Sequence, residues 1–436
     1  MQPQVPDSEA STPTPALPPR RFYTTAARLL EVDPKQLLKI ASIILLVLWC
    51  VWWAVSLQKG TLVGYESRGW FGPYFGIDYT RNTDGPTRIW LAGNDPYEDK
   101  DLLFCYPPPV LRMFAWCGWF TPEQSLRIWI VGIGMIAAAG AWAAWRCRQK
   151  LQLSEIPMTT AVAAILFSTP VVFAMERAKY DMLVLLFLLI GIACWRSNSL
   201  WAQLAAGAVL ALAPWAKLYP GLIGLGLLGL HRGKTLAAFV IVGLAIGLSD
   251  IDEMRRFLTN NDIHIAKANY LSAIAPPTQV HAWNHSLTEN WPRIWHNTPL
   301  WLLGKINGKL AGGTILATLL LWVTWHVHRC PDRNRFAYPY LLWVVALATF
   351  VPPIANDYTL MFLPLAAVAL WDRRAPVLVH VSMLCLALWW QPLGLPINGR
   401  LLILFKLGGL VSVGIMLIEQ LCEARMSPRR APFFVP

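Results

Sequence analysis

The run LKIASIILLVLWCVWWAVSL, residues 38–57, decides the fold class of this chain. It carries a single charged side chain, Lys39, within an otherwise apolar stretch. A transmembrane helix needs about 20 predominantly apolar residues to cross the hydrocarbon core of a bilayer, so this run predicts a membrane span. Further apolar runs follow at residues 123–145, 159–175, 180–195, 199–214, 217–231, 235–250, 309–328, 337–351, 358–371, 376–391 and 400–421.

The composition agrees with a membrane protein. The chain has 436 residues, of which 56% are hydrophobic and only 14% are charged, whereas soluble domains carry about 25% charged residues. We therefore predict an all-α polytopic membrane protein with about 12 transmembrane helices between residues 38 and 421. The polar, Pro-rich residues 1–37 predict a disordered cytoplasmic tail, and residues 422–436 predict a second cytoplasmic tail.

The distribution of positive charge predicts the orientation of these spans. Short basic clusters are typical of cytoplasmic loops, whereas long loops contribute little to orientation. The two long loops, residues 58–122 and 251–308, then lie on the outer side. Within the first of them, residues 106–120 are too short to span and predict a helix lying along the outer leaflet. The basic clusters assigned to the inner side are residues 146–150, Arg196, 231–234, 329–335 and 372–374. Orientation thus accounts for the net charge of +12, and we expect no nucleic-acid partner.

The same topology brings unusual polar residues to the outer side. Ionisable groups near a bilayer boundary are costly unless they pair or face water, so they are candidates for function. Two plainer explanations remain open: Lys217 could snorkel to lipid head groups, and the groups of the segment ERAKYD, residues 176–181, could pair locally. The candidates are Asp78, Asp84, Arg177, Lys179, Asp181, Lys217, Asn284, His285, Asp357 and Tyr358.

Short motifs along the chain resemble a known family. The first outer loop contains Asp78-Tyr79, then GNDPY at 93–97, then Tyr106-Pro107-Pro108. Later motifs are AAGAVLALAPWAKLYP at 205–220, NHSL at 284–287 and PPIANDYTLMFLPL at 352–365. In this order they resemble glycosyltransferase family 87, the bacterial mannosyltransferase-like proteins of the GT-C superfold, over most of residues 40–370. The chain departs from the resemblance at ERAKYD, where many members carry Gly-Gln-x-Asn, and at Asp357-Tyr358, where some carry a His.

The resemblance implies a reaction at a membrane surface. A hexose or pentose, mannose-like, would pass with inversion from a polyprenyl-phosphate donor to a glycolipid or glycan acceptor. The site would face the periplasm from a bacterial inner membrane. In this interpretation Asp78 is the base and Asp84 the second candidate, because a carboxylate can take the proton of the acceptor hydroxyl.

The remaining candidates fit binding roles in the same reaction. Cations stabilise a phosphate more strongly as its charge grows, which suits Lys217 first and Arg177 or Lys179 second. The expected sugar- or acceptor-binding residues are Tyr97, Tyr106, Asp181, Asn284, His285, Asp357 and Tyr358. The sequence has no zinc-type Cys/His spacing, and Asp78 and Asp84 are loosely spaced for a shared divalent ion, so we expect no metal and no cofactor.

Two other classes of membrane protein fit part of this pattern. A transporter or flippase of a lipid-linked or polar solute would also be polytopic. Such proteins often show internal repeats and charged residues at mid-membrane. The unusual charges of this chain lie instead at the edges of spans on one side. A polysaccharide polymerase or ligase would use Arg or His in its outer loops. The second outer loop does contain Arg255, Arg256, His264 and His281.

Overall fold

The computed structural model describes most of the chain. The described residues are 33–59, 76–98, 104, 106–153, 155–195, 197, 199–259, 285–296, 298–352, 357–372 and 399–426. Throughout these ranges the chain forms helices and turns, and no β-strand occurs in them. The prediction of an all-α membrane protein is therefore confirmed at the level of fold class.

Among the described residues, four helices are long and apolar enough to cross a membrane. They are α2 (Pro34–Lys59), α6 (Pro122–Lys150), α17 (Gly308–His328) and α21 (Gly399–Met426). Two bent pairs raise the number to as many as six. The pair α7 (Met158–Leu166) and α8 (Thr169–Glu176) bends by 59°, and the pair α13 (Gly233–Leu248) and α14 (Ile251–Thr259) bends by 84°.

The prediction of twelve spans is not confirmed, because several apolar runs form short or broken helices. The run at 199–231 is divided into α10 (Leu200–Leu210), α11 (Leu212–Ala216), η3 (Tyr219–Leu222) and α12 (Ile223–Gly229). The other short apolar elements are α9 (Asp181–Cys194), α18 (Ala337–Ala348), η6 (Asp357–Met361) and α19 (Phe362–Leu370). A helix of 12 residues such as α18 is well below the length of a straight span. The expected span at 376–391 lies outside the described residues.

Helices α18 and α19 form the centre of the molecule, and α6, α9 and α21 pack around them. Hydrogen bonds cross between helices in this core: Tyr338 donates to the carbonyl of Gly140 at 2.7 Å, and Trp343 donates to the carbonyl of Leu410 at 2.8 Å. Small residues permit the closest approach, as expected where backbone packing drives helix association in a membrane. A Cβ on Gly207 of α10 would lie 2.2 Å from the carbonyl oxygen of Thr235 on α13.

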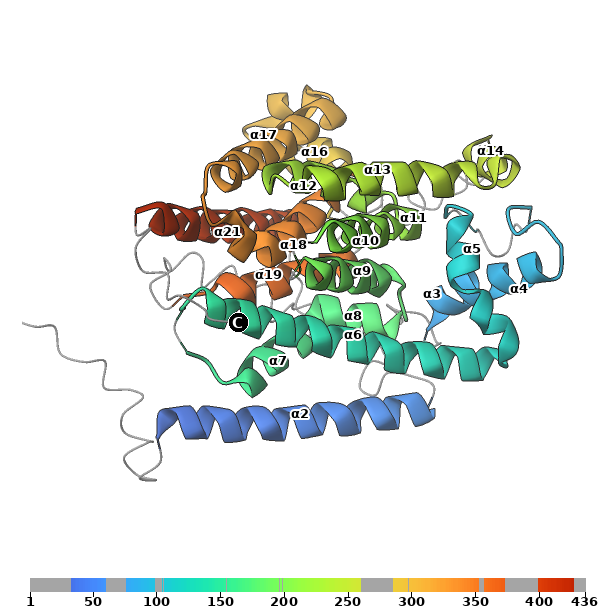
Figure 1. Ribbon diagram of the computed structural model, residues 1–436, viewed down its shortest axis with the longest axis horizontal. Helices are drawn as coiled ribbons and strands as arrows, with labels where there is room; N and C mark the ends of the chain where they lie inside the picture. Colours follow the sequence, from blue (N-terminus) through green and yellow to red (C-terminus); the bar gives the residue numbers. More distant parts are fainter. Residues whose placement is uncertain are drawn as a thin grey trace, which may run out of the picture.

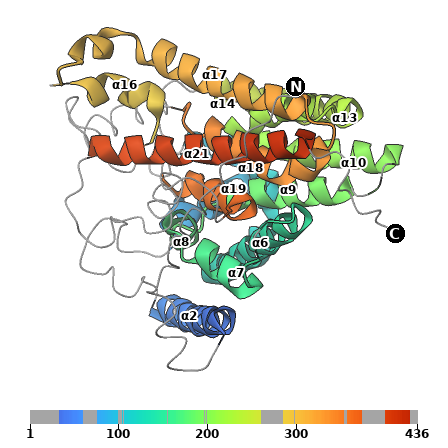
Figure 2. The ribbon, with the colours of Figure 1, turned by 90° about the vertical axis from the view of Figure 1, so that its left-hand side faces the viewer.

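The outer helices expose apolar side chains along their length. Helix α2 packs against α7 at one side of the molecule, whereas α17 lies at the other side with α16 (Leu287–Trp295) (Figures 1 and 2). Exposed apolar surface of this extent marks a membrane-facing surface. Its largest exposed members include Ile44, Val47 and Leu48 on α2, Ile241 and Leu244 on α13, and Leu310 and Leu321 on α17.

The basic clusters gather at one end of the helices. Arg335 donates to the carbonyl of Lys150, and Arg333 donates to the carbonyls of Leu230 and His328 at 3.3 and 3.2 Å. Cations at helix C-termini interact favourably with the helix dipole and satisfy the last carbonyls. The clusters at 146–150, 231–234 and 329–335 thus share one end, as their sequence pattern predicted; η5 (Arg333–Phe336) belongs to it.

The opposite end carries the described part of the first outer loop. Helix α6 begins there, and the short helices α3 (Ile77–Tyr79), α4 (Gly85–Leu91) and α5 (Pro109–Met113) gather around its start (right-hand side of Figure 1). A single π-helical turn, η1 (Thr80–Asp84), joins α3 to α4; the 3₁₀ turns η2 (Ala115–Trp119) and η4 (Trp301–Lys305) are the remaining elements. Turns of the π type often occur at functional sites.

Candidate active site

The connection between α8 and α9 is the centre of the site. Helix α8 ends at Glu176 in a Schellman motif: the amide of Ala178 donates to Met175 and the amide of Lys179 donates to Ala174, both at 2.9 Å. Ala178 has a φ of 51°, a left-handed conformation that glycine usually adopts at this position. The motif ends α8 and fixes the backbone from which Lys179 and Asp181 project.

Asp78 pairs with two cations of this connection. Its Oδ2 lies 3.1 Å from Nζ of Lys179, and its Oδ1 lies 3.8 Å from Nη1 of Arg177. The start of α3 is held in place because the amide of Gly76 donates to the carbonyl of Glu176 at 2.9 Å. Gly76 has a φ of 72°, and a Cβ there would lie 2.4 Å from the end of the Leu126 side chain, so both the backbone conformation and the available space favour glycine.

Lys217 forms a second ion pair with the same connection. Its Nζ lies 2.8 Å from Oδ1 of Asp181, and the hydroxyl of Tyr219 donates to the same oxygen at 2.7 Å. The ammonium also lies 5.6 Å from the ring centres of both Tyr180 and Tyr219, within the range of cation–π attraction. Lys217 has an extended backbone at the break between α11 and η3. Non-helical backbone at membrane depth occurs where it is buried in protein or lines a cavity.

The two ion pairs differ in which member is exposed. In the first pair the carboxylate of Asp78 is 21% exposed and the side chain of Lys179 is 3% exposed. In the second pair the side chain of Lys217 is 11% exposed and that of Asp181 is fully buried. The site therefore presents a carboxylate and an ammonium, each backed by a buried counter-ion.

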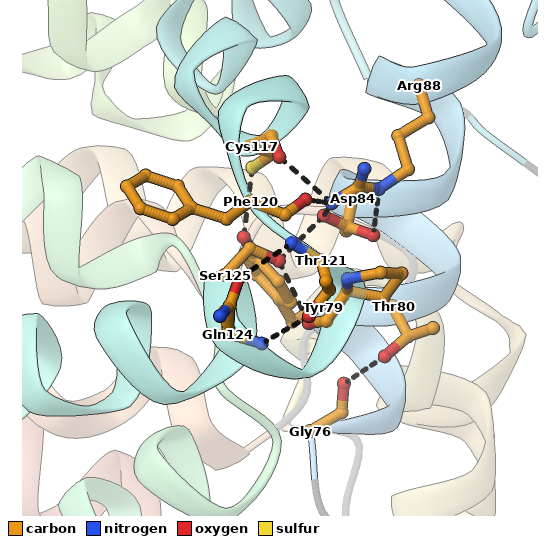
Figure 3. A network of polar contacts seen from close by, with 11 residues as sticks. Gly76, Tyr79, Thr80, Asp84, Arg88, Cys117, Phe120, Thr121, Gln124 and Ser125 are labelled. Atoms are coloured by element: carbon orange, nitrogen blue, oxygen red, sulfur yellow. Dashed lines mark hydrogen bonds and ion pairs between the residues drawn. The ribbon is translucent and has the colours of Figure 1, made fainter.

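Asp84 has a different environment, shown in Figure 3. Its carboxylate accepts hydrogen bonds from Nε and Nη2 of Arg88, at 2.8 and 3.0 Å, and from the hydroxyl of Ser125, at 2.8 Å. Arg88 also donates to the carbonyls of Cys117 and Phe120, at 2.9 and 2.8 Å. The hydrogen bond to Asp84 raises the pKa of the Arg88 guanidinium. Asp84 therefore joins the first outer loop to the start of α6, and its carboxylate is occupied by this network.

The groups next to this network stay neutral. Burial raises the pKa of the Tyr79 hydroxyl, which lies 2.9 Å from Sγ of Cys117. Burial likewise raises the pKa of the Cys117 thiol to about 11. Tyr79 also packs face to face with Trp129, whose Nε1 donates to the carbonyl of Ala178 at 2.9 Å. The network is thus packed directly against the connection that carries the ion pairs.

Tyr97 and Tyr106 of the first outer loop pack together beside the site. Tyr97 donates to the carbonyl of Tyr106 at 2.8 Å, and the ring of Tyr106 meets the ring of Tyr180 edge-on at 4.8 Å. Helix α14 holds these tyrosines in place, because Arg256 pairs with Asp95 at 3.0 Å. Two further contacts, Arg112 with Asp250 and Trp90 with Glu253, join the same two segments.

The later candidates are placed only in part. The ring of His285 is fully buried; it lies 3.0 Å from the hydroxyl of Thr349 and packs edge-on against Phe350. Asn284 lies outside the described residues, and so do the side chains of Asp357 and Tyr358, whose backbone begins η6. Element η6 packs against α8, which ends at the central connection.

The structure thus brings five candidates together: Asp78, Arg177, Lys179, Asp181 and Lys217. Sequence reasoning did not identify Tyr180 and Tyr219, although each stands within two residues of a charged candidate. Among the described residues no group of three or more His, Cys, Asp or Glu side chains is arranged to hold a metal ion.

Comparison with known proteins identifies the family. The family model described as glycosyltransferase family 87 matches residues 104–388. The match includes the central connection and Lys217, whereas Asp78 and Asp84 precede it. No curated protein and no solved structure gives a significant match. Because the matched residues make up more than half of the chain, this protein belongs to glycosyltransferase family 87 and is a membrane glycosyltransferase.

Proposed function

We propose that the protein transfers a sugar from a polyprenyl-phosphate donor to an acceptor hydroxyl at the end of the bundle that carries Asp78 and Lys217. The observation that carries this proposal is the pairing of both residues with one short connection, residues 177–181. A carboxylate and an ammonium from different segments, both of them partly exposed, thereby lie at the same end of the membrane-spanning helices. The transferase unit comprises residues 38–421.

Asp78 acts as the general base in this proposal. Its carboxylate takes the proton from the acceptor hydroxyl as that oxygen attacks C1 of the donor sugar. The bond between C1 and the phosphate oxygen breaks on the opposite face, so the configuration at C1 inverts. The proton ends on Asp78, and the bonding electrons leave with the lipid phosphate. Asp84 is a weaker candidate for this role because Arg88 and Ser125 occupy its carboxylate.

Lys217 stabilises the departing phosphate. The negative charge on the phosphate grows as the C1–oxygen bond breaks, so a fixed ammonium binds the transition state more tightly than the ground state. Arg177, whose side chain is partly exposed beside Asp78, is the second cation. The ring of Tyr106, which is partly exposed and packs edge-on against the buried Tyr180, provides an aromatic surface on which a sugar face can pack.

The donor and the sidedness follow from the same arrangement. A polyprenyl-phosphate donor lies in the leaflet and presents its sugar at the membrane surface, where this site is expected. The basic clusters lie at the opposite end of the helices, which by the positive-inside rule is cytoplasmic. The site then faces the periplasm of a bacterial inner membrane, both termini are cytoplasmic, and the acceptor is a glycolipid or glycan that receives a mannose-like sugar.

The test is transfer of a radiolabelled sugar from a polyprenyl-phosphate donor in membranes that contain the protein. We expect Asp78→Asn and Lys217→Met each to reduce the rate of transfer by about 10²-fold or more. The control is Glu155→Gln, which removes the exposed pair of Glu155 with Lys35 and should leave transfer unchanged. Wild-type transfer by Asp78→Asn or Lys217→Met would refute the assignment. Movement of the intact donor across vesicle membranes without a covalent product would instead favour a flippase.

A further inference from the structure

The two ion pairs of the site differ in which member is buried: the cation in one pair and the anion in the other. Lys179 lies behind Asp78, and Asp181 lies behind Lys217, as their exposed fractions show. Both buried partners come from the same connection and are separated by Tyr180 alone. One short segment therefore supplies a buried cation to the partly exposed carboxylate of Asp78 and a buried anion to the partly exposed ammonium of Lys217.

The side chain of Lys179 is poorly placed to receive a lipid phosphate. It is almost completely buried, and its ammonium is directed at Oδ2 of Asp78 from 3.1 Å. Its backbone is held by the Schellman motif at the end of α8, with the amide of Lys179 bonded to Ala174. A charge at such a position is tolerated only with a partner. Lys179 can therefore hold the carboxylate of Asp78 in position without contacting a ligand.

Asp181 has the corresponding relation to Lys217. Its Oδ1 accepts from both Nζ of Lys217 and the hydroxyl of Tyr219, so the position of this oxygen is fixed by two donors. Removal of its charge would leave the largely buried ammonium of Lys217 without this carboxylate, so the side chain would no longer be held in the same position. Among the described residues, Oδ2 of Asp181 has no hydrogen-bond donor, so direct binding of a sugar hydroxyl is the alternative to be tested.

We propose that Lys179 and Asp181 are positioning residues: Lys179 orients the base Asp78, Asp181 orients the phosphate-binding Lys217, and neither contacts the substrate. This proposal rests on the proposed function and refines it. The spacing between base and phosphate cation is then set by the rigid turn at residues 177–181, because both counter-ions are attached to it. The sequence expectation that Lys179 binds phosphate and that Asp181 binds sugar is replaced by these roles.

The first experiment measures binding of sugar-free polyprenyl phosphate to the purified full-length protein. Direct binding requires no turnover, so it separates this proposal from the proposed reaction. We expect Lys217→Met and Asp181→Ala each to weaken binding by about tenfold or more. We also expect the double variant to bind no more weakly than Lys217→Met, because Asp181 acts through Lys217. The conservative Asp181→Asn and Tyr219→Phe should show smaller losses in the same direction.

The second experiment separates Lys179 from the phosphate. Lys179→Met should leave the affinity for sugar-free polyprenyl phosphate and the KM for the donor within about twofold of wild type, while it lowers kcat by about tenfold or more. Lys179→Arg should restore part of kcat, because it returns a cation beside Asp78. Tyr219→Phe and Lys179→Arg change the side-chain volume only slightly, so they keep the test informative if a larger truncation prevents folding.

Three results would overturn the positioning roles. Unchanged binding of sugar-free lipid phosphate by Asp181→Ala, with weaker binding of the sugar-bearing donor, would place Asp181 on the sugar. Additive losses in the double variant would show that Asp181 acts independently of Lys217. Weaker lipid-phosphate binding by Lys179→Met, comparable to that of Lys217→Met, would make Lys179 a phosphate ligand. If the wild-type protein binds no lipid phosphate, the proposed function itself fails, and the positioning roles fall with it.

Discussion

Replacement of Asp84 by Asn separates a structural carboxylate from a catalytic one. Asp84 is buried and accepts two hydrogen bonds from Arg88 and one from Ser125. Asn keeps one acceptor oxygen, but it loses the charge and turns donor hydrogens toward Arg88. Breaking a buried ion pair by removing one partner costs about 3–5 kcal/mol. Arg88 retains the carbonyls of Cys117 and Phe120, so we expect a loss near the lower limit, about 3 kcal/mol.

A graded series tests this magnitude. Ser125→Ala removes one neutral donor from the same carboxylate and should cost about 1 kcal/mol. The order of stability in thermal unfolding of the detergent-solubilised protein should be wild type, then Ser125→Ala, then Asp84→Asn. Once transfer rates are normalised to folded protein, Asp84→Asn should stay within a few-fold of wild type. Asp78→Asn should lose a factor of about 10²–10⁴, the usual contribution of a general base.

The contrast between the two aspartates is the decisive part of this experiment. Asp78→Asn also leaves Lys179 beside a neutral side chain, so it too is expected to lower stability. Stability alone therefore does not distinguish the two positions, whereas the rate per folded molecule does. If Asp84→Asn folds normally but loses transfer as completely as Asp78→Asn, Asp84 takes part in the reaction and the structural interpretation is wrong.

Three further predictions follow from packing, burial and topology. Gly207→Ala should destabilise the protein by about 3 kcal/mol, the upper end of the cost of overpacking, because the added Cβ meets the carbonyl of Thr235. Gly313→Ala is the matched control, because a Cβ there meets nothing within 4 Å. Equal melting temperatures of the two variants would contradict the close packing of α10 on α13. With a pKa of about 11, the thiol of Cys117 is roughly 0.1% ionised at pH 8. It should therefore resist alkylation in the folded protein and react after denaturation. Rapid labelling of the native protein would contradict the burial of this thiol. In a background without native cysteines, a membrane-impermeant maleimide should label Glu98→Cys but not Gln149→Cys in intact spheroplasts. The two exposed positions lie at opposite ends of the bundle. Labelling of Gln149→Cys alone would show that the protein has the opposite orientation in the membrane.

The parts of the fold that could be predicted are those controlled by local pattern. The apolar runs at 38–57, 123–145, 309–328 and 400–421 correspond to the four long helices α2, α6, α17 and α21. The basic clusters identified one end of these helices, because charge in short loops is selected by orientation. The number of spans was not predictable, since short apolar runs can cross, bend or stop within the core. The run at 199–231, with Pro214 and Pro220, shows this most clearly.

The site was predictable as a neighbourhood but not as a set of contacts. The sequence placed Asp78, the segment ERAKYD and Lys217 on the same side, because Asp78 lies in the first long outer loop and the other two lie at the edges of apolar runs. Which cation meets which carboxylate depends on the left-handed turn at Ala178 and on the break after α11, and both are set by tertiary packing. The ion pair between Asp84 and Arg88 could have been predicted from the sequence. Arg88 follows Asp84 by four residues, a spacing that brings side chains together on a helix.

The most direct measurement is a structure of the full-length protein with sugar-free polyprenyl phosphate bound. We predict the phosphate at about 2.7–2.9 Å from Nζ of Lys217, the range of charge-assisted hydrogen bonds, with the carboxylate of Asp78 facing the same space. Two results would contradict a shared donor site at Asp78 and Lys217. The phosphate could bind at the basic end, near Arg333 and Arg335, or the lipid could bind with Asp78 and Lys217 facing separate spaces.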